Sequence, residues 1–311
     1  MNVKNGLIGL KDISREEIEN IVDTAFSMKE ISFRNIKKVP TLRGKTIINL
    51  FFESSTRTKT SFEIAAKRLS ADVINFSSSS SSVSKGETTI DTAKNIESMN
   101  PDVFIVRHYS SGVMELLQRH LKTPIISAGD GTNEHPTQGL LDIMTIIEEK
   151  KKIDGLKIVI AGDIYHSRVA RSDLYGMSKL GASVWFFAPP TLISDDFNSL
   201  GAKVTYSPQD AFTDADVVIM LRIQLERQGS GLFPTTREYS RFFGLSEQKL
   251  SLAKPDVIVM HPGPINRGIE LPSGIADGIN SRILKQVENG VAVRMAVIYK
   301  AAGGADEHTD N

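Results

Sequence analysis

The sequence has no cysteine among its 311 residues. This absence excludes disulfide bonds, thiolate metal sites, iron–sulfur clusters and cysteine nucleophiles, and it fits a reducing compartment. No apolar run reaches the roughly 18 residues of a membrane-spanning helix. The first residues also lack the apolar core and small-residue cleavage site of a signal peptide. We therefore expect a soluble, cytoplasmic protein.

The chain also has no formal net charge, because 37 lysines and arginines balance 37 aspartates and glutamates. A general nucleic-acid or polyanion binder usually carries a basic excess, so this balance argues against that class and leaves a local basic pocket open. The apolar fraction of 40% and the charged fraction of 24% are those of an ordinary globular protein. At about 150 residues per domain, the length predicts about two domains.

Several motifs that carry chemistry are missing as well. There is no HExxH, no calcium-binding loop and no paired His/Asp spacing that would suggest a metal. A GxSxG nucleophile, a Walker phosphate loop and a GxGxxG fingerprint are also absent. We therefore expect neither a metal nor a cofactor, and catalysis by positioning and charge stabilisation.

Short apolar runs alternate with longer helical patterns along the chain. Strands are predicted at Thr46–Phe51, Val73–Phe76, Val103–Val106, Pro124–Ser127, Lys157–Ala161, Ser183–Phe187, Lys203–Tyr206, Val217–Leu221 and Val257–Met260. Helices are predicted at Ser14–Phe33, Thr58–Leu69, Glu87–Met99, Pro136–Lys151 and Val169–Leu180, the first opening with a Ser-x-x-Glu capping box. Apolar strands interleaved with helices indicate parallel sheets covered on both faces, so the class is α/β.

A polar run at 148–152 precedes a fresh strand, which predicts a hinge near Pro136–Lys152. Two α/β halves joined there would leave a cleft between the carboxyl ends of their strands. The expected fold is thus two doubly wound parallel-sheet domains with the active site in the cleft between them. A tract of six serines at 77–82 is, by composition, a flexible surface loop.

The segment 51–60 ends one predicted strand and begins a helix. Free N–H groups at a helix start favour an anion, and Ser55, Thr56 and Thr58 add hydroxyl donors. Arg57 adds a planar fork that can grip a phosphate with two hydrogen bonds. An ordinary capped helix with a surface arginine is the alternative.

Two further positions stand next to predicted elements. Arg107 follows an apolar strand, where a cation in an α/β domain faces the cleft, although a solvated arginine fits equally well. His135 precedes the helix that starts at Pro136, and a helix dipole favours its neutral form, which can donate to a carbonyl. A cap or a surface histidine is the alternative. Gln138 offers a donor and an acceptor nearby.

Three more loops follow predicted strands at 162–172, 221–227 and 261–268. The first carries Arg168 at its turn, and the prolines and glycines of the last force a rigid loop that allows close approach. Cations thus recur in loops or just after strands, at Arg57, Lys85, Arg107, Arg168 and Arg222. Cations that converge on one cleft need an anionic partner, so the ligand should carry several negative charges.

These residues resemble a known family, the catalytic chains of aspartate carbamoyltransferase, over nearly the whole chain and in the same order. SerThrArgThr at 55–58 together with HisProThrGln at 135–138 marks the carbamoyltransferases. Arg222-x-Gln224 and HisProGlyPro at 261–264 are typical of the aspartate branch, and the segment at 162–172 matches too. The ornithine branch carries HisCysLeuPro, and this chain has no cysteine.

The resemblance implies an aspartate carbamoyltransferase of pyrimidine biosynthesis. It implies a carbamoyl-phosphate-binding domain at 1–145 plus 284–311 and an aspartate-binding domain at 146–283. It also implies a homotrimer with shared active sites, with regulatory or dihydroorotase-type partner chains as possible additions. The charge balance and the lack of a long apolar run predict neither nucleic acid nor membrane as a partner. A carbamoyltransferase for another amine, such as ornithine, and a catalytically silent anion-binding protein of the same fold are the alternatives.

The resemblance also implies roles for individual residues. Phosphate would contact Ser55, Thr56, Arg57, Thr58 and Arg107. The carbonyl oxygen would contact Arg57, Thr58 and His135. The carbamoyl NH2 group would contact Gln138 and the backbone of Pro262 and Gly263. Aspartate would contact Lys85, Arg168, Arg222 and Gln224. Ser81 and Lys85 would come from a neighbouring subunit, which makes the serine tract a mobile loop that closes over the ligands. The catalytic residues would be Arg57, Thr58, Lys85 and His135.

The chain departs from the family pattern at two positions. Lys59 stands where the family often has arginine. Gly263 stands where some members carry leucine, so we expect a more flexible loop there.

Overall fold

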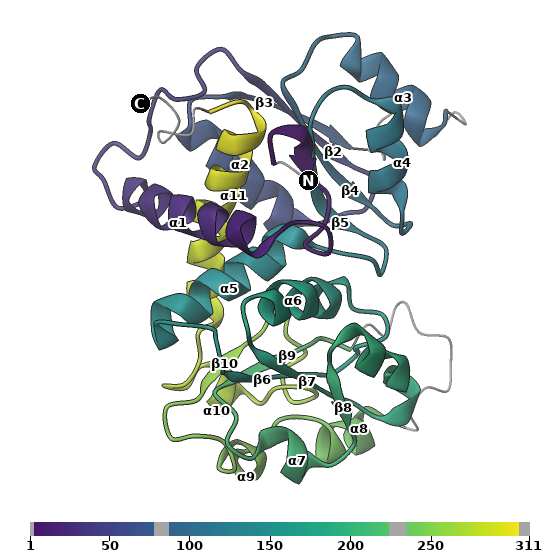
Figure 1. Cartoon of the computed structure of the whole chain (residues 1–311), viewed down its shortest axis with the longest axis vertical. Helices are drawn as coiled ribbons and strands as arrows, with labels where there is room; N and C mark the ends of the chain where they lie inside the picture. Colours follow the sequence, from purple (N-terminus) through teal and green to yellow (C-terminus); the bar gives the residue numbers. More distant parts are fainter. Residues whose placement is uncertain (1–2, 78–86, 224–234, 305–311) are drawn as a thin grey trace. The chain divides into compact units, whose positions relative to one another are not determined.

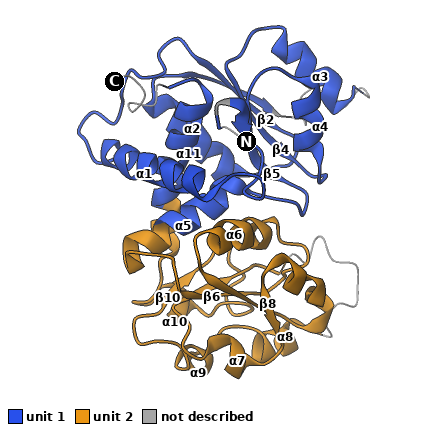
Figure 2. Cartoon of the chain, viewed as in Figure 1, with its two compact units in different colours: residues 1–144, 288–311 blue, residues 145–287 orange. Residues whose placement is uncertain are grey.

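The computed structural model describes residues 3–77, 87–223 and 235–304. The predicted site residues Ser81, Lys85 and Gln224, and most of the serine tract, lie outside these ranges. The chain divides into two compact units, Met1–Met144 with Glu288–Asn311 (unit 1) and Thr145–Val287 (unit 2), shown in Figure 2. Among the described residues no helix is long and apolar enough to cross a membrane.

Unit 1 contains a five-stranded parallel sheet in the order β1-β5-β4-β2-β3. Its strands are β1 (Gly6–Leu7), β2 (Thr46–Phe51), β3 (Asp72–Ser77), β4 (Val103–His108) and β5 (Ile125–Asp130). Its helices are α1 (Arg15–Ile31), α2 (Thr56–Arg68), α3 (Thr89–Glu97), α4 (Val113–His120), most of α5 (Pro136–Lys150) and most of α11 (Ile283–Ala301), as Figure 1 shows.

Two helices of unit 1, α1 and α3, begin where a local side chain, Ser14 or Thr88, accepts a hydrogen bond from one of the first N–H groups. Ser14 accepts a hydrogen bond from the N–H of Glu17 at 3.2 Å, and the Glu17 carboxylate accepts from the N–H of Ser14 at 3.0 Å. This confirms the predicted capping box. On the sheet, Leu50 and Phe104 pack with Leu117 of α4 in one apolar core, so the central strands are buried and read as continuous apolar runs.

Unit 2 repeats this plan with the sheet order β10-β9-β6-β7-β8, again all parallel. Its strands are β6 (Lys157–Ala161), β7 (Ser183–Phe187), β8 (Lys203–Thr205), β9 (Val217–Met220) and β10 (Ile258–Met260). Its helices are α6 (Arg168–Lys179), α7 (Pro208–Phe212), α8 (Thr236–Phe242), α9 (Glu247–Leu250) and α10 (Ser273–Ala276). The prediction of two parallel-sheet α/β domains is thus confirmed.

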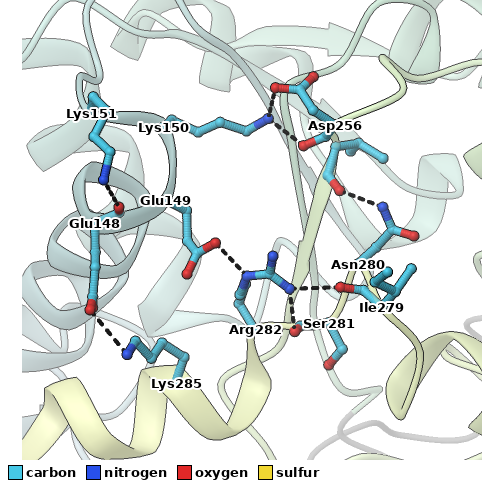
Figure 3. Close-up of polar contacts among 11 residues, drawn as sticks. Glu148, Glu149, Lys150, Lys151, Asp256, Ile279, Asn280, Ser281, Arg282 and Lys285 are labelled. Carbon is cyan, nitrogen blue, oxygen red and sulfur yellow. Dashed lines mark hydrogen bonds and ion pairs between the residues drawn. The ribbon is translucent and has the colours of Figure 1, made fainter.

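The last turn of α5 is bound to the rest of unit 2 by ion pairs (Figure 3). Glu149 pairs with Arg282 at 2.6 Å and Glu148 pairs with Lys285 at 3.0 Å. The ammonium group of Lys150 pairs with Asp256 at 2.7 Å. The chain passes between the units in α5 and near the start of α11. These ion pairs therefore join the two crossing segments within unit 2.

Each sheet has a topological switch point, at which successive strands stop adding on one side of the sheet and begin adding on the other. In unit 1 the chain runs outward from β2 to β3 and then continues on the other side with β4. In unit 2 it runs outward from β6 through β8 and continues on the other side with β9. Loops that follow the strands at such a switch point diverge and leave a crevice at the carboxyl edge of the sheet. Ligands are therefore expected beside the loops after β2, β4, β6 and β9.

Candidate functional site

The turn between β2 and α2 lies at the switch point of unit 1. Ser55 is the N-cap residue of α2, with extended backbone (φ −158°, ψ 94°), and its side chain makes no capping hydrogen bond. Thr58 is buried, whereas Thr56 and Arg57 are exposed. Because the first N–H groups of a helix have no intrahelical partner, this turn combines hydroxyl and N–H donors with a cation and can bind an anion.

Arg107 lies on the neighbouring strand, directly opposite Phe51 in the β2–β4 pairing. Its Nη1 donates to the carbonyl oxygen of Ala128 at 3.0 Å, and its Nε lies 3.3 Å from a carboxylate oxygen of Glu53. Only 11% of the side chain is exposed. Arg107 is therefore a braced guanidinium beside the β2–α2 turn, and the alternative of a solvated arginine is wrong.

The turn that precedes α5 is organised by Asp130, which is fully buried. Its carboxylate accepts from the N–H of Gly112 at 2.8 Å and from the N–H of Glu134 at 3.3 Å. Burial raises the pKa of Asp130 to about 6, against the lowering effect of these hydrogen bonds. The Asp130 side chain thus fixes the turn whose last residue is His135.

His135 is 5% exposed and directly precedes α5, as predicted. Its carbonyl oxygen accepts from the N–H groups of Gln138 and Gly139 at 2.9 and 3.2 Å. The neighbouring Glu134 accepts from the N–H groups of Leu10 and Lys11 at 2.7 and 3.1 Å. The N-terminal segment is therefore tied to the residue before His135. Sequence reasoning missed this contact, since a single glutamate carries no pattern.

Gln138 belongs to a buried network that sequence reasoning also missed. Its Nε2 donates to the Asp142 carboxylate one turn along α5, at 3.1 Å. The Asp142 charge acts on the guanidinium of Arg294 in α11, and Arg294 in turn donates to the hydroxyl of Ser61 in α2 at 2.8 Å. Burial lowers the pKa of Arg294 to about 10, partly offset by Asp142. Asp142 thus holds the amide of Gln138 and also interacts with the charge of Arg294 in α11.

In unit 2 the loop after β6 leads into α6. Asp163 is fully buried, and one of its carboxylate oxygens lies 2.8 Å from Nδ1 of His166. Ser167 caps α6 by accepting from the N–H of Ala170 at 3.2 Å, so Arg168 is the first helical residue. Arg168 is only 7% exposed. The predicted turn therefore carries a buried cation at a helix start, which is suited to an anionic ligand group.

The loops after β6 and β9 lie against each other. A Cβ added to Gly162, whose φ is +133°, would come within 2.5 Å of the carbonyl oxygen of Leu221, so glycine is required there. The N–H of Leu221 donates to the carbonyl oxygen of Ala161 at 2.7 Å. Arg222 comes next and is partly buried. Arg168 and Arg222 thus follow the two strands at the switch point of unit 2.

The loop after β10 holds Pro262 and Gly263, both partly buried. The N–H of Gly263 donates to Nδ1 of His261 at 2.8 Å. Gly263 has a φ of +68°, in the left-handed region that favours glycine, which gives a conformational reason for glycine where a leucine would be strained. This loop ends the strand next to β9, so it shares the carboxyl edge with Arg222.

The described candidates form one group in each unit. Unit 1 carries Ser55, Thr56, Arg57, Thr58, Arg107, His135 and Gln138. Unit 2 carries Arg168, Arg222, Pro262 and Gly263. No set of three His, Asp or Glu side chains within the described ranges could hold a metal ion.

Comparisons with known proteins agree with this arrangement. Residues 5–148 match the family "Aspartate/ornithine carbamoyltransferase, carbamoyl-P binding domain", and residues 154–301 match "Aspartate/ornithine carbamoyltransferase, Asp/Orn binding domain". The chain is 58% identical over 299 residues to the aspartate carbamoyltransferase catalytic subunit of Geotalea daltonii, with 96% of both chains covered. It is 56% identical over 302 residues to that of Syntrophus aciditrophicus, covering 97% of this chain and 98% of the relative.

Solved structures show the same fold. Aspartate transcarbamoylase from Trypanosoma cruzi in complex with carbamoyl phosphate matches with a TM-score of 0.84 and 28% identity, covering 96% of each chain. Ornithine carbamoyltransferase from Pyrococcus furiosus matches with a TM-score of 0.86 and 30% identity, covering 98% of this chain and 99% of that one. The fold is thus common to both branches, and the resemblance seen in the sequence is confirmed: the chain belongs to the aspartate/ornithine carbamoyltransferase family.

Proposed function

We propose that the protein transfers the carbamoyl group of carbamoyl phosphate to the amino group of L-aspartate, giving N-carbamoyl-L-aspartate and phosphate, in de novo pyrimidine biosynthesis. The observation that carries the choice of acceptor is the pair Arg168 and Arg222 after the two strands at the switch point of unit 2. Two guanidinium groups suit the two carboxylates of aspartate. The names of relatives 56–59% identical over at least 96% of the chain support the same choice.

Carbamoyl phosphate would bind to unit 1. Its phosphate would take the N–H groups at the start of α2, the hydroxyls of Ser55, Thr56 and Thr58, and the guanidinium groups of Arg57 and Arg107. The brace on Arg107 by Glu53 and the Ala128 carbonyl supports this role, because a cation held in place loses less entropy when it binds a ligand.

The carbonyl oxygen would accept hydrogen bonds from Arg57, Thr58 and His135. The NH2 group would be held by Gln138 and by the backbone of Pro262 and Gly263. When the aspartate amine attacks the carbonyl carbon, negative charge develops on that oxygen, and donors already aimed at it stabilise the transition state. Burial of Thr58 and His135 strengthens these interactions, since little water screens them.

Aspartate would bind to unit 2 through Arg168, Arg222 and Gln224. Its amine must be neutral to attack, and the cationic Lys85 would disfavour the ammonium form. Phosphate would leave and accept the amine proton. An ornithine side chain is itself cationic, so Arg222 would be a poor neighbour for it.

The larger assembly follows the same resemblance. A cytoplasmic homotrimer would share its active sites, with Ser81 and Lys85 contributed by the adjacent subunit and the segment that carries them closing over the ligands. Regulatory or dihydroorotase-type chains would be possible partners. Residues 1–145 with 284–311 would form the carbamoyl-phosphate domain and residues 146–283 the aspartate domain. The cleft predicted between the domains stays a prediction.

Steady-state phosphate release tests the proposal. The purified protein should release phosphate from carbamoyl phosphate at a rate that saturates with L-aspartate and falls to the uncatalysed rate without it. Release that does not depend on aspartate, or no release with a folded protein, contradicts the proposed reaction.

A further inference from the structure

A buried carboxylate lies behind the loops of unit 2 that carry candidate substrate contacts. Glu270 has no exposed surface, and one of its oxygens lies 3.2 Å from Nε2 of His261, the residue that follows β10. Nδ1 of the same ring accepts from the N–H of Gly263 at 2.8 Å. Because Nδ1 accepts, Nε2 carries the proton and donates to Glu270, which fixes both the tautomer and the orientation of the imidazole.

The same oxygen of Glu270 also binds a residue further along the loop that follows β10, and this residue reaches the segment after β9. It accepts from the backbone N–H of Asn266 at 2.5 Å. The side-chain Nδ2 of Asn266 then donates to the carbonyl oxygen of Ile223 at 3.3 Å. Ile223 is fully buried and directly follows Arg222. One carboxylate is thus linked both to the loop that holds Pro262 and to the segment that holds Arg222.

The carboxylate and the imidazole are themselves fixed by the fold. The carbonyl oxygen of Glu270 accepts from the N–H of Leu245 at 3.0 Å, and the N–H of His261 donates to the Gln286 side chain at 2.9 Å. Both residues are therefore held at the backbone as well as through their side chains. A group held this rigidly can fix the position of the loop that it contacts, which a solvated carboxylate could not do.

We propose that Glu270 is a positioning residue with two arms. Through His261 it sets the loop whose Pro262 and Gly263 backbone would hold the carbamoyl NH2 group, and through Asn266 it sets the segment whose Arg222 would hold an aspartate carboxylate. The inference rests on the proposed function for the identity of the two ligands. The two binding loops of unit 2 thus share one support. Its two arms, the contact through His261 and the contact through Asn266, can be removed separately.

Cutting both arms at once should weaken both interactions. Glu270→Ala leaves the Nε2–H of His261 and the N–H of Asn266 buried without an acceptor, so both loops move to find new partners. A displacement of about 1 Å in substrate-positioning groups lowers turnover by about a hundredfold. Glu270→Gln keeps an oxygen that accepts from both donors, so it should retain most of the activity.

Removing the contact through the Asn266 side chain should change one kinetic constant, the KM for aspartate. Asn266→Ala removes only the bond to the Ile223 carbonyl, so the KM for aspartate should rise about tenfold while the KM for carbamoyl phosphate stays unchanged. Asn280→Ala is the matched control. Its Nδ2 donates to the carbonyl oxygen of Val257 at 2.8 Å, next to the start of β10 and so at the far end of that strand from His261. It should leave both constants unchanged.

The experiment measures kcat and both KM values for the wild type and these four variants, with a thermal midpoint for each. The inference is supported if Asn266→Ala raises only the aspartate KM, Asn280→Ala changes neither, and Glu270→Gln restores what Glu270→Ala loses. It is overturned if Asn266→Ala behaves like Asn280→Ala, or if activity falls only in proportion to the folded fraction with both KM values constant. A folded wild type without activity overturns the proposed function itself, which distinguishes the two failures.

Discussion

Replacing Arg294 by methionine should destabilise unit 1, because it removes the positive charge that interacts with the buried carboxylate of Asp142. Arg294 is 5% exposed, donates to Ser61 and lies over the ring of Phe62 at 5.1 Å. The drop in its pKa from 12.5 to about 10 means that folding disfavours the charged guanidinium by about 3 kcal/mol. Methionine relieves that penalty, but it also removes the favourable interaction with Asp142.

The balance of these effects predicts a net loss. Removing one of two interacting buried charges costs about 3–5 kcal/mol. Asp142 would keep the hydrogen bond from Gln138 but lose the interaction with the opposite charge. Asp142→Asn in the same chain removes that second charge, and its amide oxygen can still accept from Gln138. The double variant Arg294→Met/Asp142→Asn should therefore regain at least about 2 kcal/mol relative to Arg294→Met alone.

Urea unfolding followed by far-UV circular dichroism is the assay. The chain has one tryptophan, Trp185, which lies in unit 2, so its fluorescence would not follow the helices of unit 1. Lys67→Met is the control, because the pair of Lys67 with Glu63 on α2 is exposed and contributes only about 0.2–0.5 kcal/mol. The reasoning is refuted if the free energy of unfolding of Arg294→Met lies within about 1 kcal/mol of the wild-type value, because surface substitutions already cause changes approaching that size. It is also refuted if the effects of the two substitutions are additive.

Three other perturbations have defined outcomes. Arg57→Ala should lower turnover by about a hundredfold or more, as for the loss of one oxyanion donor, with an unchanged thermal midpoint because the side chain is exposed; near-normal turnover in the folded variant would remove Arg57 from the site. The pKa of Asp130 is raised from 3.8 to about 6, so the folded state keeps a proton that the unfolded chain has lost, and the free energy of unfolding should fall as pH rises from about 4 to about 6, by up to about 3 kcal/mol. Urea unfolding across this range should show that fall in the wild type and not in Asp130→Asn. Inactive Arg57→Ala and Lys85→Ala chains, refolded together in equal amounts as trimers, should regain about a quarter of the sites if each site is shared between subunits; trimers without recovery would refute sharing.

The strands of this fold were predictable because most are buried on both faces. The predicted ranges at 46–51, 157–161 and 183–187 coincide with β2, β6 and β7. β1 escaped prediction because it has only two residues, Gly6 and Leu7, and exists through its pairing with β5. The passage of the chain between the units inside α11 has no local signal either, since it depends on which body each end of the helix packs against.

The positions of Arg57, Arg107, Arg168 and Arg222 could be predicted because each follows an apolar strand or lies at the start of a helix. The residues that brace the candidate site could not be. Glu53, Arg294 and Glu270 act through partners that local patterns do not indicate, and Arg294 donates to a residue 233 positions away. Single buried charges have no periodicity or spacing, so only the folded chain reveals which loop each of them supports.

The most direct test of the central claim offers the protein a choice of acceptor. Carbamoyl phosphate labelled with carbon-13 is mixed with equal concentrations of L-aspartate and L-ornithine, and the carbamoylated products are separated by mass. With guanidinium groups after both strands at the switch point of unit 2, labelled N-carbamoyl-L-aspartate should be the product and carbamoyl-ornithine should stay at the level of the protein-free control. Carbamoyl-ornithine in equal or greater amount would contradict the assignment.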